Sequence, residues 1–274
     1  LTNVTINKGV KTIGRWAFDN CKKITYVNYT GSREDWCRIN FGSNPISGSE
    51  NCNLYINGEP VGDVVIPKDV SNIHNLFAGC KNITSVMIPD GVKSIDSQAF
   101  EYCSGLQSVI ISNSVKFIGW RSFDGCTKLS NITIGNSVKR IESETFRDCS
   151  SLTSITIPNS VKSIEEESFF GCSSLVSVTI PDSIISIGDG AFSGCVGLTN
   201  ITIPDSVMSI GRNPFSGCVN LISIVVDSNN PIYDSRNDCN AIVNSSTKIL
   251  ISACKKTYIP DSVTSIGEYA FYNC

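Results

Sequence analysis

The residues able to do chemistry in this 274-residue chain are one histidine, thirteen cysteines and two short acidic runs. A nucleophilic triad needs a histidine beside its serine or cysteine, and His74 is the only histidine in the sequence. The runs Glu142–Glu144 and Glu165–Glu167 carry the residue type that glycosidases use as acid and base. We interpret His74 as an exposed or capping residue and the acidic runs as solvated charge, and we predict no catalytic residue and no cofactor. An enzyme that uses these surface carboxylates remains the remote alternative.

Seven of the cysteines are spaced evenly and belong to a repeat of 23 residues. Each of them follows a phenylalanine by three positions, and we call these pairs the Phe–Cys ladder. Its members are Phe77 and Cys80, Phe100 and Cys103, Phe123 and Cys126, Phe146 and Cys149, Phe169 and Cys172, Phe192 and Cys195, and Phe215 and Cys218. The few apolar residues of one copy cannot enclose a core alone, so neighbouring copies must stack into a continuous apolar column. The ladder is therefore predicted to be structural.

The spacing within one repeat predicts its local structure. Val109 and Ile111 are two residues apart and β-branched, which predicts a short strand whose copies form a parallel sheet along one wall. The ladder phenylalanine, the cysteine and the leucine or isoleucine after them are spaced by three, which predicts short helical or 3-10 turns on another wall. The residue before the cysteine is Gly, Asn or Asp in every copy except at Tyr102, and these types indicate a left-handed backbone conformation.

Two stretches, "IPDSVMSIGRNPFSGCVNLISI" and "IPNSVKSIEEESFFGCSSLVSV", resemble the BspA-like leucine-rich repeat family of bacterial and protozoan cell-surface proteins. The resemblance covers nearly the whole chain. It implies a β-rich, right-handed solenoid of the leucine-rich-repeat type. It also implies a non-catalytic module for protein interaction or adhesion, extracellular or at the cell surface of a microbe.

We expect residues 1–274 to form a single leucine-rich-repeat solenoid. The sequence begins inside one repeat and ends inside another at Cys274, which predicts a fragment of a longer protein. Residues 30–63 and 226–258 depart from the repeat, and both resemble variant units of that family. We interpret them as elaborated coils of the same solenoid and not as separate domains.

Hairpins are predicted in both elaborated coils. Leu54–Ile56 and Val64–Ile66 flank the dipeptide Asn57-Gly58, a strong signal for a tight hairpin turn. In the second elaborated coil, Ala241–Val243 and Ile249–Ile251 are predicted to pair in the same way. The repeat is also one residue short before Cys80, which predicts a local distortion near His74.

The cysteines are predicted to be buried free thiols without a metal. Equivalent Cβ atoms on stacked strands lie about 4.8 Å apart, whereas bridged cysteines need about 3.5 to 4.5 Å. No Cys-x-x-Cys pair occurs and only one histidine is available, so a zinc site is not expected. Cys239 and Cys254 lie off the ladder, and a disulfide between them stays an open alternative.

Composition limits the possible partners. The net charge of -3 provides no field that would attract nucleic acid or an anionic membrane. No apolar stretch approaches the roughly 18 residues that span a bilayer, so we expect no direct membrane insertion of this segment. The expected partner is a protein or a glycan, with host extracellular matrix as one candidate, and the oligomeric state stays open.

The candidate binding residues are polar residues that alternate with the inward residues of the predicted strands. They are Asn131 and Thr133, Ser154 and Thr156, Ser177 and Thr179, and Asn200 and Thr202. Alternation places both members of a pair on the outer face, and stacking aligns the pairs into two rows. We predict a binding face there. The alternatives are ordinary solvated strand residues on an architectural spacer, or an ice-binding surface, whose rows Met87 and Ile110 would interrupt.

Overall fold

The structure is a computed structural model that describes residues 1–15, 17–18, 20–42 and 52–273. The predicted elaborated coil 30–63 is therefore only partly described, and Cys274 lies outside the described residues. The chain divides into two compact units, which we call unit 1 (Leu1–Val138) and unit 2 (Lys139–Cys274). Within both units, paired strand residues are commonly 23 positions apart, as in Ser108 with Asn131 and Ser154 with Ser177. Each unit is thus a stack of solenoid coils of about one repeat each.

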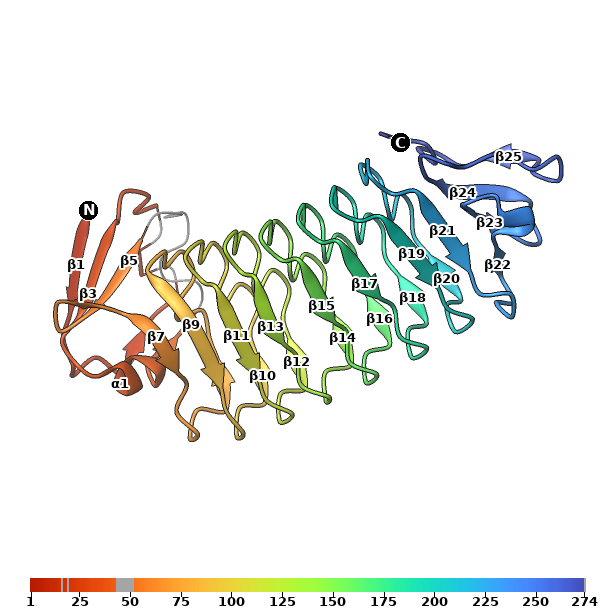
Figure 1. Ribbon diagram of the computed structural model, residues 1–274. Helices are drawn as coiled ribbons and strands as arrows, with labels where there is room; N and C mark the ends of the chain where they lie inside the picture. The colour runs from red at the N-terminus through yellow and green to blue at the C-terminus, as the bar shows by residue number, and fades with distance from the viewer. Residues whose placement is uncertain (16, 19, 43–51, 274) are drawn as a thin grey trace. The chain divides into compact units, whose positions relative to one another are not determined.

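The described part of unit 1 contains longer strands, two-residue strands and one short helix (Figure 1). Its elements are β1 (Asn3–Ile6), β2 (Thr12–Ile13), β3 (Tyr26–Tyr29), α1 (Arg33–Cys37), β4 (Asn40–Phe41), β5 (Asn53–Ile56), β6 (Glu59–Pro60), β7 (Gly62–Val65), β8 (Asn72–Ile73), β9 (Ile83–Ile88), β10 (Ser94–Ile95), β11 (Ser108–Ile111), β12 (Phe117–Ile118) and β13 (Asn131–Thr133). The longer strands form the sheets β1-β3-β5 and β7-β9-β11-β13, and the two-residue β6 extends the first of them. The other two-residue strands form β2-β4 and β8-β10-β12.

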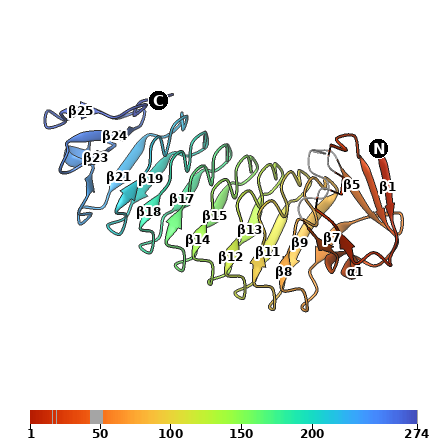
Figure 2. The ribbon, with the colours of Figure 1, turned by 180° about the vertical axis from the view of Figure 1, so that it is seen from behind.

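Unit 2 repeats this arrangement and then departs from it, and Figure 2 shows it from the opposite side. Its elements are β14 (Arg140–Ile141), β15 (Ser154–Thr156), β16 (Ser163–Ile164), β17 (Ser177–Thr179), β18 (Ser186–Ile187), β19 (Asn200–Ile203), β20 (Ser209–Ile210), β21 (Ser223–Val226), β22 (Tyr233–Asp234), the 3-10 helix η1 (Arg236–Asp238), β23 (Ala241–Asn244), β24 (Ile249–Ala253) and β25 (Ser265–Ile266). The sheets are β14-β16-β18-β20, β15-β17, β19-β21 and β22-β23-β24-β25. No helix among the described residues is long and apolar enough to cross a membrane.

The strand predicted at Val109 and Ile111 is confirmed, because both residues lie in β11 and are buried. A second parallel sheet was not predicted. It consists of two-residue strands such as β10, whose Ile95 pairs with Ile118 of β12. A strand of two residues is too short to give an alternating pattern, so the sequence carries no periodic signal for it.

The wall that carries the Phe–Cys ladder consists of tight turns. In one coil, the Cys103 amide donates to the Phe100 carbonyl at 3.1 Å, and the Leu106 amide donates to the Cys103 carbonyl at 2.9 Å. Both bonds span three residues, as in a 3-10 turn. The predicted left-handed residue before the cysteine is confirmed, with φ of 70° at Gly125 and 57° even at Tyr102.

A second left-handed position lies five residues before the cysteine and was not predicted. It is occupied by Gln98 and Arg121 in unit 1 and by Glu144, Glu167 and Asn213 in unit 2, with φ between 50° and 63°. Most of these residue types do not favour positive φ, so the sequence gives no signal for it. Hydrogen bonds between coils hold the conformation: the Glu144 amide donates to the Glu166 carbonyl at 2.9 Å.

The ladder phenylalanines form stacks in the interior of each unit. In unit 1 the ring centroids of Phe77 and Phe100 lie 5.5 Å apart and those of Phe100 and Phe123 lie 5.3 Å apart, with ring planes within 5°. In unit 2 the successive distances along the stack are 5.4, 5.2 and 5.7 Å for Phe146, Phe169, Phe192 and Phe215. These rings are buried, and offset aromatic pairs at such distances stabilise a core beyond the area they bury.

The first predicted hairpin has a different second strand. Asn57 and Gly58 do form the turn, with φ of 52° and 83°, but β5 pairs with β6 (Glu59–Pro60) and not with Val64–Ile66. Val64 instead lies in β7 and pairs in parallel with Val86. The turn signal fixes only the two residues that follow it, so the next apolar run remains free to join the parallel sheet.

The second predicted hairpin is confirmed. Strands β23 and β24 pair antiparallel, with Ala241 opposite Ala253 and a register shift after Ile242. Cys239 and Cys254 are both free thiols in the structure. The Cys254 thiol donates to the Asn240 carbonyl at 3.3 Å.

Candidate binding surfaces

All eight residues of the predicted binding face are exposed on the longer strands. In unit 1, Asn131 and Thr133 pair in register with Ser108 and Ile110. In unit 2, Ser154 and Thr156 of β15 stand opposite Ser177 and Thr179 of β17, while Asn200 and Thr202 of β19 stand opposite Ser223 and Val225. Binding by these residues remains a prediction.

The outer face of unit 1 carries an apolar row. Val65, Met87 and Ile110 are neighbours in register on β7, β9 and β11, and they are 60%, 46% and 50% exposed. We call these three residues the apolar row. The sequence pointed to Met87 and Ile110 only as interruptions of polar rows, and Val65 was missed because it follows an irregular segment.

The ladder cysteines make hydrogen bonds that link successive coils within a unit. Five of the seven thiols donate to the carbonyl of the ladder phenylalanine in the preceding coil. The Sγ to O distances are 2.9 Å for Cys103 to Phe77, 3.2 Å for Cys126 to Phe100, 3.1 Å for Cys172 to Phe146, 3.2 Å for Cys195 to Phe169 and 3.1 Å for Cys218 to Phe192. Burial raises the pKa of Cys103, Cys126, Cys172 and Cys195. A reactive thiolate is thereby disfavoured.

His74 follows β8, and its Nδ1 is 2.7 Å from Oδ2 of Asp96. Both side chains are partly exposed, at 38% and 40%. In the described part of the chain, no group of three or more His, Cys, Asp or Glu side chains could hold a metal ion.

The acidic runs are less exposed than the sequence analysis expected. Glu144 and Glu167 both pair with Arg147, and Glu165 pairs with Arg140 at 3.3 Å. Partial burial raises the pKa of Glu142, against the opposing influence of Arg140. Only Glu166 of these runs is an exposed residue. The interpretation as solvated charge therefore holds for Glu166 alone, because the other carboxylates are held in ion pairs with Arg140 or Arg147.

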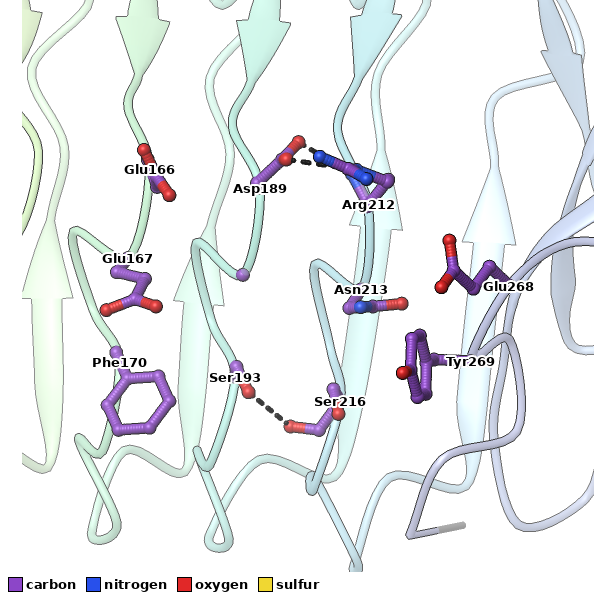
Figure 3. Close-up of a pocket in the computed structure, with 11 residues that line it drawn as sticks. Glu166, Glu167, Phe170, Asp189, Ser193, Arg212, Asn213, Ser216, Glu268 and Tyr269 are labelled. Atoms are coloured by element: carbon purple, nitrogen blue, oxygen red, sulfur yellow. Dashed lines mark hydrogen bonds and ion pairs between the residues drawn. The ribbon is translucent and has the colours of Figure 1, made fainter.

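A cleft in unit 2, which we call the terminal cleft, has a volume of about 270 Å³ (Figure 3). It extends across the coils that carry residues 166–170, 189–193 and 212–216 to the segment 268–269. The lining residues are Glu166, Glu167, Phe170, Asp189, Gly190, Ser193, Arg212, Asn213, Ser216, Glu268 and Tyr269. A second cavity of about 320 Å³ shares Asp189, Arg212, Asn213 and Glu268 with it and adds Ile210, Gly211, Ile251 and Gly267.

The terminal cleft is acidic. Arg212 is held by Asp189, with Nε 3.3 Å from Oδ2 and the Arg212 amide donating to Oδ1 at 2.8 Å. Glu166 and Glu268 are exposed, and neither makes an ion pair with any described residue. The side-chain oxygen of Asn213 is buried and receives no hydrogen bond within the described structure.

These coils, sheets and stacked interior residues define a solenoid protein of the leucine-rich-repeat class. A protein family described as "BspA type Leucine rich repeat region" matches residues 1–46, 72–176 and 139–274 of the chain, in six copies. The chain belongs to this family, whose repeats are typical of protein-interaction modules and are generally non-enzymatic. No curated protein sequence matches the chain.

Solved structures of bacterial leucine-rich repeat proteins are similar to the chain. A leucine rich cell surface protein from Faecalibacterium prausnitzii is 34% identical, with a TM-score of 0.62, over 79% of this chain and 63% of that protein. A leucine-rich repeat protein from Bacteroides ovatus is 27% identical, with a TM-score of 0.70, over 99% of this chain and 73% of that protein. The chain thus spans less than two thirds of the length of the first of these proteins.

Proposed function

We propose that the chain is a non-catalytic adhesion or interaction module of a cell-surface or secreted protein, and that it binds a partner macromolecule through the outer face of its longer strands. The observation that carries this proposal is the apolar row of unit 1. Three large apolar side chains lie next to one another in register on an otherwise polar sheet face. A spacer has no need for such a row, and exposed apolar surface rimmed by polar residues is typical of an interaction site.

The similar protein from F. prausnitzii supports the location, because it is described as a cell surface protein. The partner is a protein or glycan outside the cell, such as a component of host matrix. Repeat solenoids present extended surfaces to such partners.

The test is binding of the purified chain to immobilised matrix proteins and to a glycan panel, measured by surface plasmon resonance. Replacement of Val65, Met87 and Ile110 together by Ser should weaken binding at least about tenfold, because the apolar contact area is lost. The control variant replaces Ile185 and Met208 by Ser, since these are similarly exposed, at 50% and 48%, but lie outside the longer strands.

Two results would contradict the proposal. Absence of saturable binding to every probe would favour the architectural spacer. An equal loss of binding in the control variant would show that the strand face is not the contact surface.

A further inference from the structure

The terminal cleft forms where the stacking of unit 2 is interrupted. Strand β20 is the last member of the sheet β14-β16-β18-β20, and the two later short strands, β22 and β25, belong to the sheet β22-β23-β24-β25 instead. The Ile210 amide, at the open edge of β20, donates to the Tyr233 hydroxyl at 3.0 Å and not to a strand carbonyl. The gap that opens here contains both cavities, with Ile210 and Ile251 lining one of them.

The hydrogen bonding of the cleft is incomplete. The side-chain oxygen of Asn213 is buried without a donor among the described residues, and Figure 3 shows this amide pointing toward Glu268 and Tyr269. A buried acceptor without a donor is costly and uncommon in native proteins. A ligand group that reaches this oxygen would satisfy it by donating a hydrogen bond.

The charge of the cleft favours a ligand group that is both a hydrogen-bond donor and positively charged. Arg212 is neutralised by Asp189 and Glu167 by Arg147, at positions inside unit 2. The carboxylates of Glu166 and Glu268 are left without a cation and both line the cleft. Uncompensated carboxylates beside a partly enclosed surface favour a cationic group.

An aromatic ring completes the arrangement. Tyr269 is 56% exposed and lines the cleft beside Glu268, whereas the ring of Phe170 is already covered by Arg147, whose Cζ is 4.7 Å from the ring centroid. A guanidinium group is planar, stacks on aromatic rings and donates several hydrogen bonds in one plane. A lysine ammonium lacks this planar fork.

We propose that the terminal cleft binds the guanidinium group of an arginine side chain from a partner protein, paired with Glu268, stacked on Tyr269 and donating to Asn213. This inference rests on the proposed interaction role but uses a different surface from the apolar row. A side chain of a partner protein is favoured over free arginine, because the repeats of this family are typical of protein-interaction modules.

The experiment is a titration of the ¹⁵N-labelled chain, followed by NMR, with the blocked peptide acetyl-Gly-Arg-Gly-amide. Matched peptides carry lysine or citrulline in place of arginine, and free arginine is titrated separately. We expect saturable shifts at the amides of Arg212, Asn213 and Tyr269, strongest binding by the arginine peptide, weaker binding by lysine and by free arginine, and a loss of about tenfold or more with citrulline, which keeps the shape but not the charge.

Variants assign the contacts. Glu268→Gln should weaken the arginine peptide about tenfold without a change in the fold, because Glu268 is exposed. Asn213→Gly, which tolerates the φ of 54° at this position, should also weaken it. Glu59→Gln, an exposed glutamate of β6 in unit 1, is the matched control and should leave binding unchanged.

The inference is overturned if citrulline binds as tightly as arginine, if Glu268→Gln leaves the affinity unaltered, or if no saturable shift occurs. Tighter binding of free arginine than of the blocked peptide would show that the cleft prefers a small molecule to a side chain of a partner protein. The strand-face proposal can fail separately, because substitution of the apolar row should not change binding of this peptide.

Discussion

The two walls of a solenoid coil differ in how strictly the residue type repeats from one coil to the next, as unit 2 shows. On the turn wall, Phe146, Phe169, Phe192 and Phe215 repeat the same residue and are buried. On the outer face of the longer strands, the equivalent position is Thr156, Thr179 and Thr202 and then becomes Val225, and all four are exposed. The inward residues are fixed because each one packs on its own copy in the next coil.

This difference indicates where stability and recognition reside. A substitution on the turn wall leaves a cavity or an unmatched ring between two identical neighbours. A substitution on the outer strand face changes only contacts with solvent and with cross-strand neighbours. The outer positions are therefore free to vary with the partner, and changes of pH or of single residues should affect the two walls to very different extents.

The largest effect is expected from alkaline pH acting on the buried thiols. Burial raises the pKa of Cys103, Cys126, Cys172 and Cys195 above the ordinary value near 9, and that of Cys37 to about 12. Above about pH 9 the unfolded chain loses thiol protons that the folded chain retains, so the free energy of unfolding falls. Each such thiol removes up to about 1.4 kcal/mol per pH unit.

The stabilisation is thus complete below about pH 9 and is lost as the pH rises toward the folded values. Because several thiols share the shift, the total loss should exceed that of any single substitution. Urea denaturation at a series of pH values measures this loss. Cys172→Ala should make the fall in the free energy of unfolding per pH unit smaller, by the contribution of one thiol. A free energy of unfolding that stays constant from about pH 8 to 10 would contradict the burial of these groups.

Among single substitutions, Phe169→Ala should have the largest effect on stability. The Phe169 ring stacks between those of Phe146 and Phe192 and is fully buried, so truncation opens a cavity with no side chain able to fill it. We expect the free energy of unfolding to fall by about 3 to 5 kcal/mol. A change below about 1 kcal/mol in urea denaturation would show that the stack can collapse around the gap.

The inward wall was largely predictable from the sequence, since a 23-residue spacing repeated over seven phenylalanines and cysteines gives many independent observations of one position. The left-handed residue before the cysteine was predictable for the same reason, because Gly, Asn and Asp recur there. The second left-handed residue, occupied by types such as Gln98 and Arg121, was not, because hydrogen bonds between coils impose it on residues without that preference.

The candidate surfaces were less predictable for a physical reason. Alternation in a strand identifies which residues face outward, and all eight of the predicted face do. It does not show which outward residues become neighbours when a segment is irregular, so Val65 and the apolar row were missed. The terminal cleft depends on β25 pairing with β24 and not with β20, and no repeat spacing encodes that choice.

Cys172→Ala tests whether the thiol is more than a filler. Its Sγ donates to the Phe146 carbonyl at 3.1 Å and is wholly buried, so the substitution removes both volume and a hydrogen bond between coils. We expect a loss of about 1 to 2 kcal/mol in the free energy of unfolding. An unchanged free energy of unfolding would show that the thiol contributes only packing, which neighbouring side chains can supply in its place.

Gly194→Ala tests the backbone of the turn wall without touching its side chains. Gly194 has a φ of 73°, and an added Cβ would meet no atom closer than 3.4 Å, at the Gly171 amide nitrogen. The cost is therefore one of conformation, about 1 kcal/mol for alanine. Asparagine at this position should cost less, since it tolerates positive φ. Equal thermal denaturation midpoints for the two variants would contradict this explanation.

The smallest effect is expected on the outer strand face, from Thr156→Ala combined with Thr179→Ala. The two threonines stand opposite each other on β15 and β17 and are exposed, so their loss removes one cross-strand contact and some β propensity. The free energy of unfolding should change by about 0.5 kcal/mol or less. A loss comparable to that of Phe169→Ala would remove the contrast between the walls. A binding partner whose affinity falls in this variant while stability is retained would show that this face is used for recognition, because the two effects reside in different residues of the same coils.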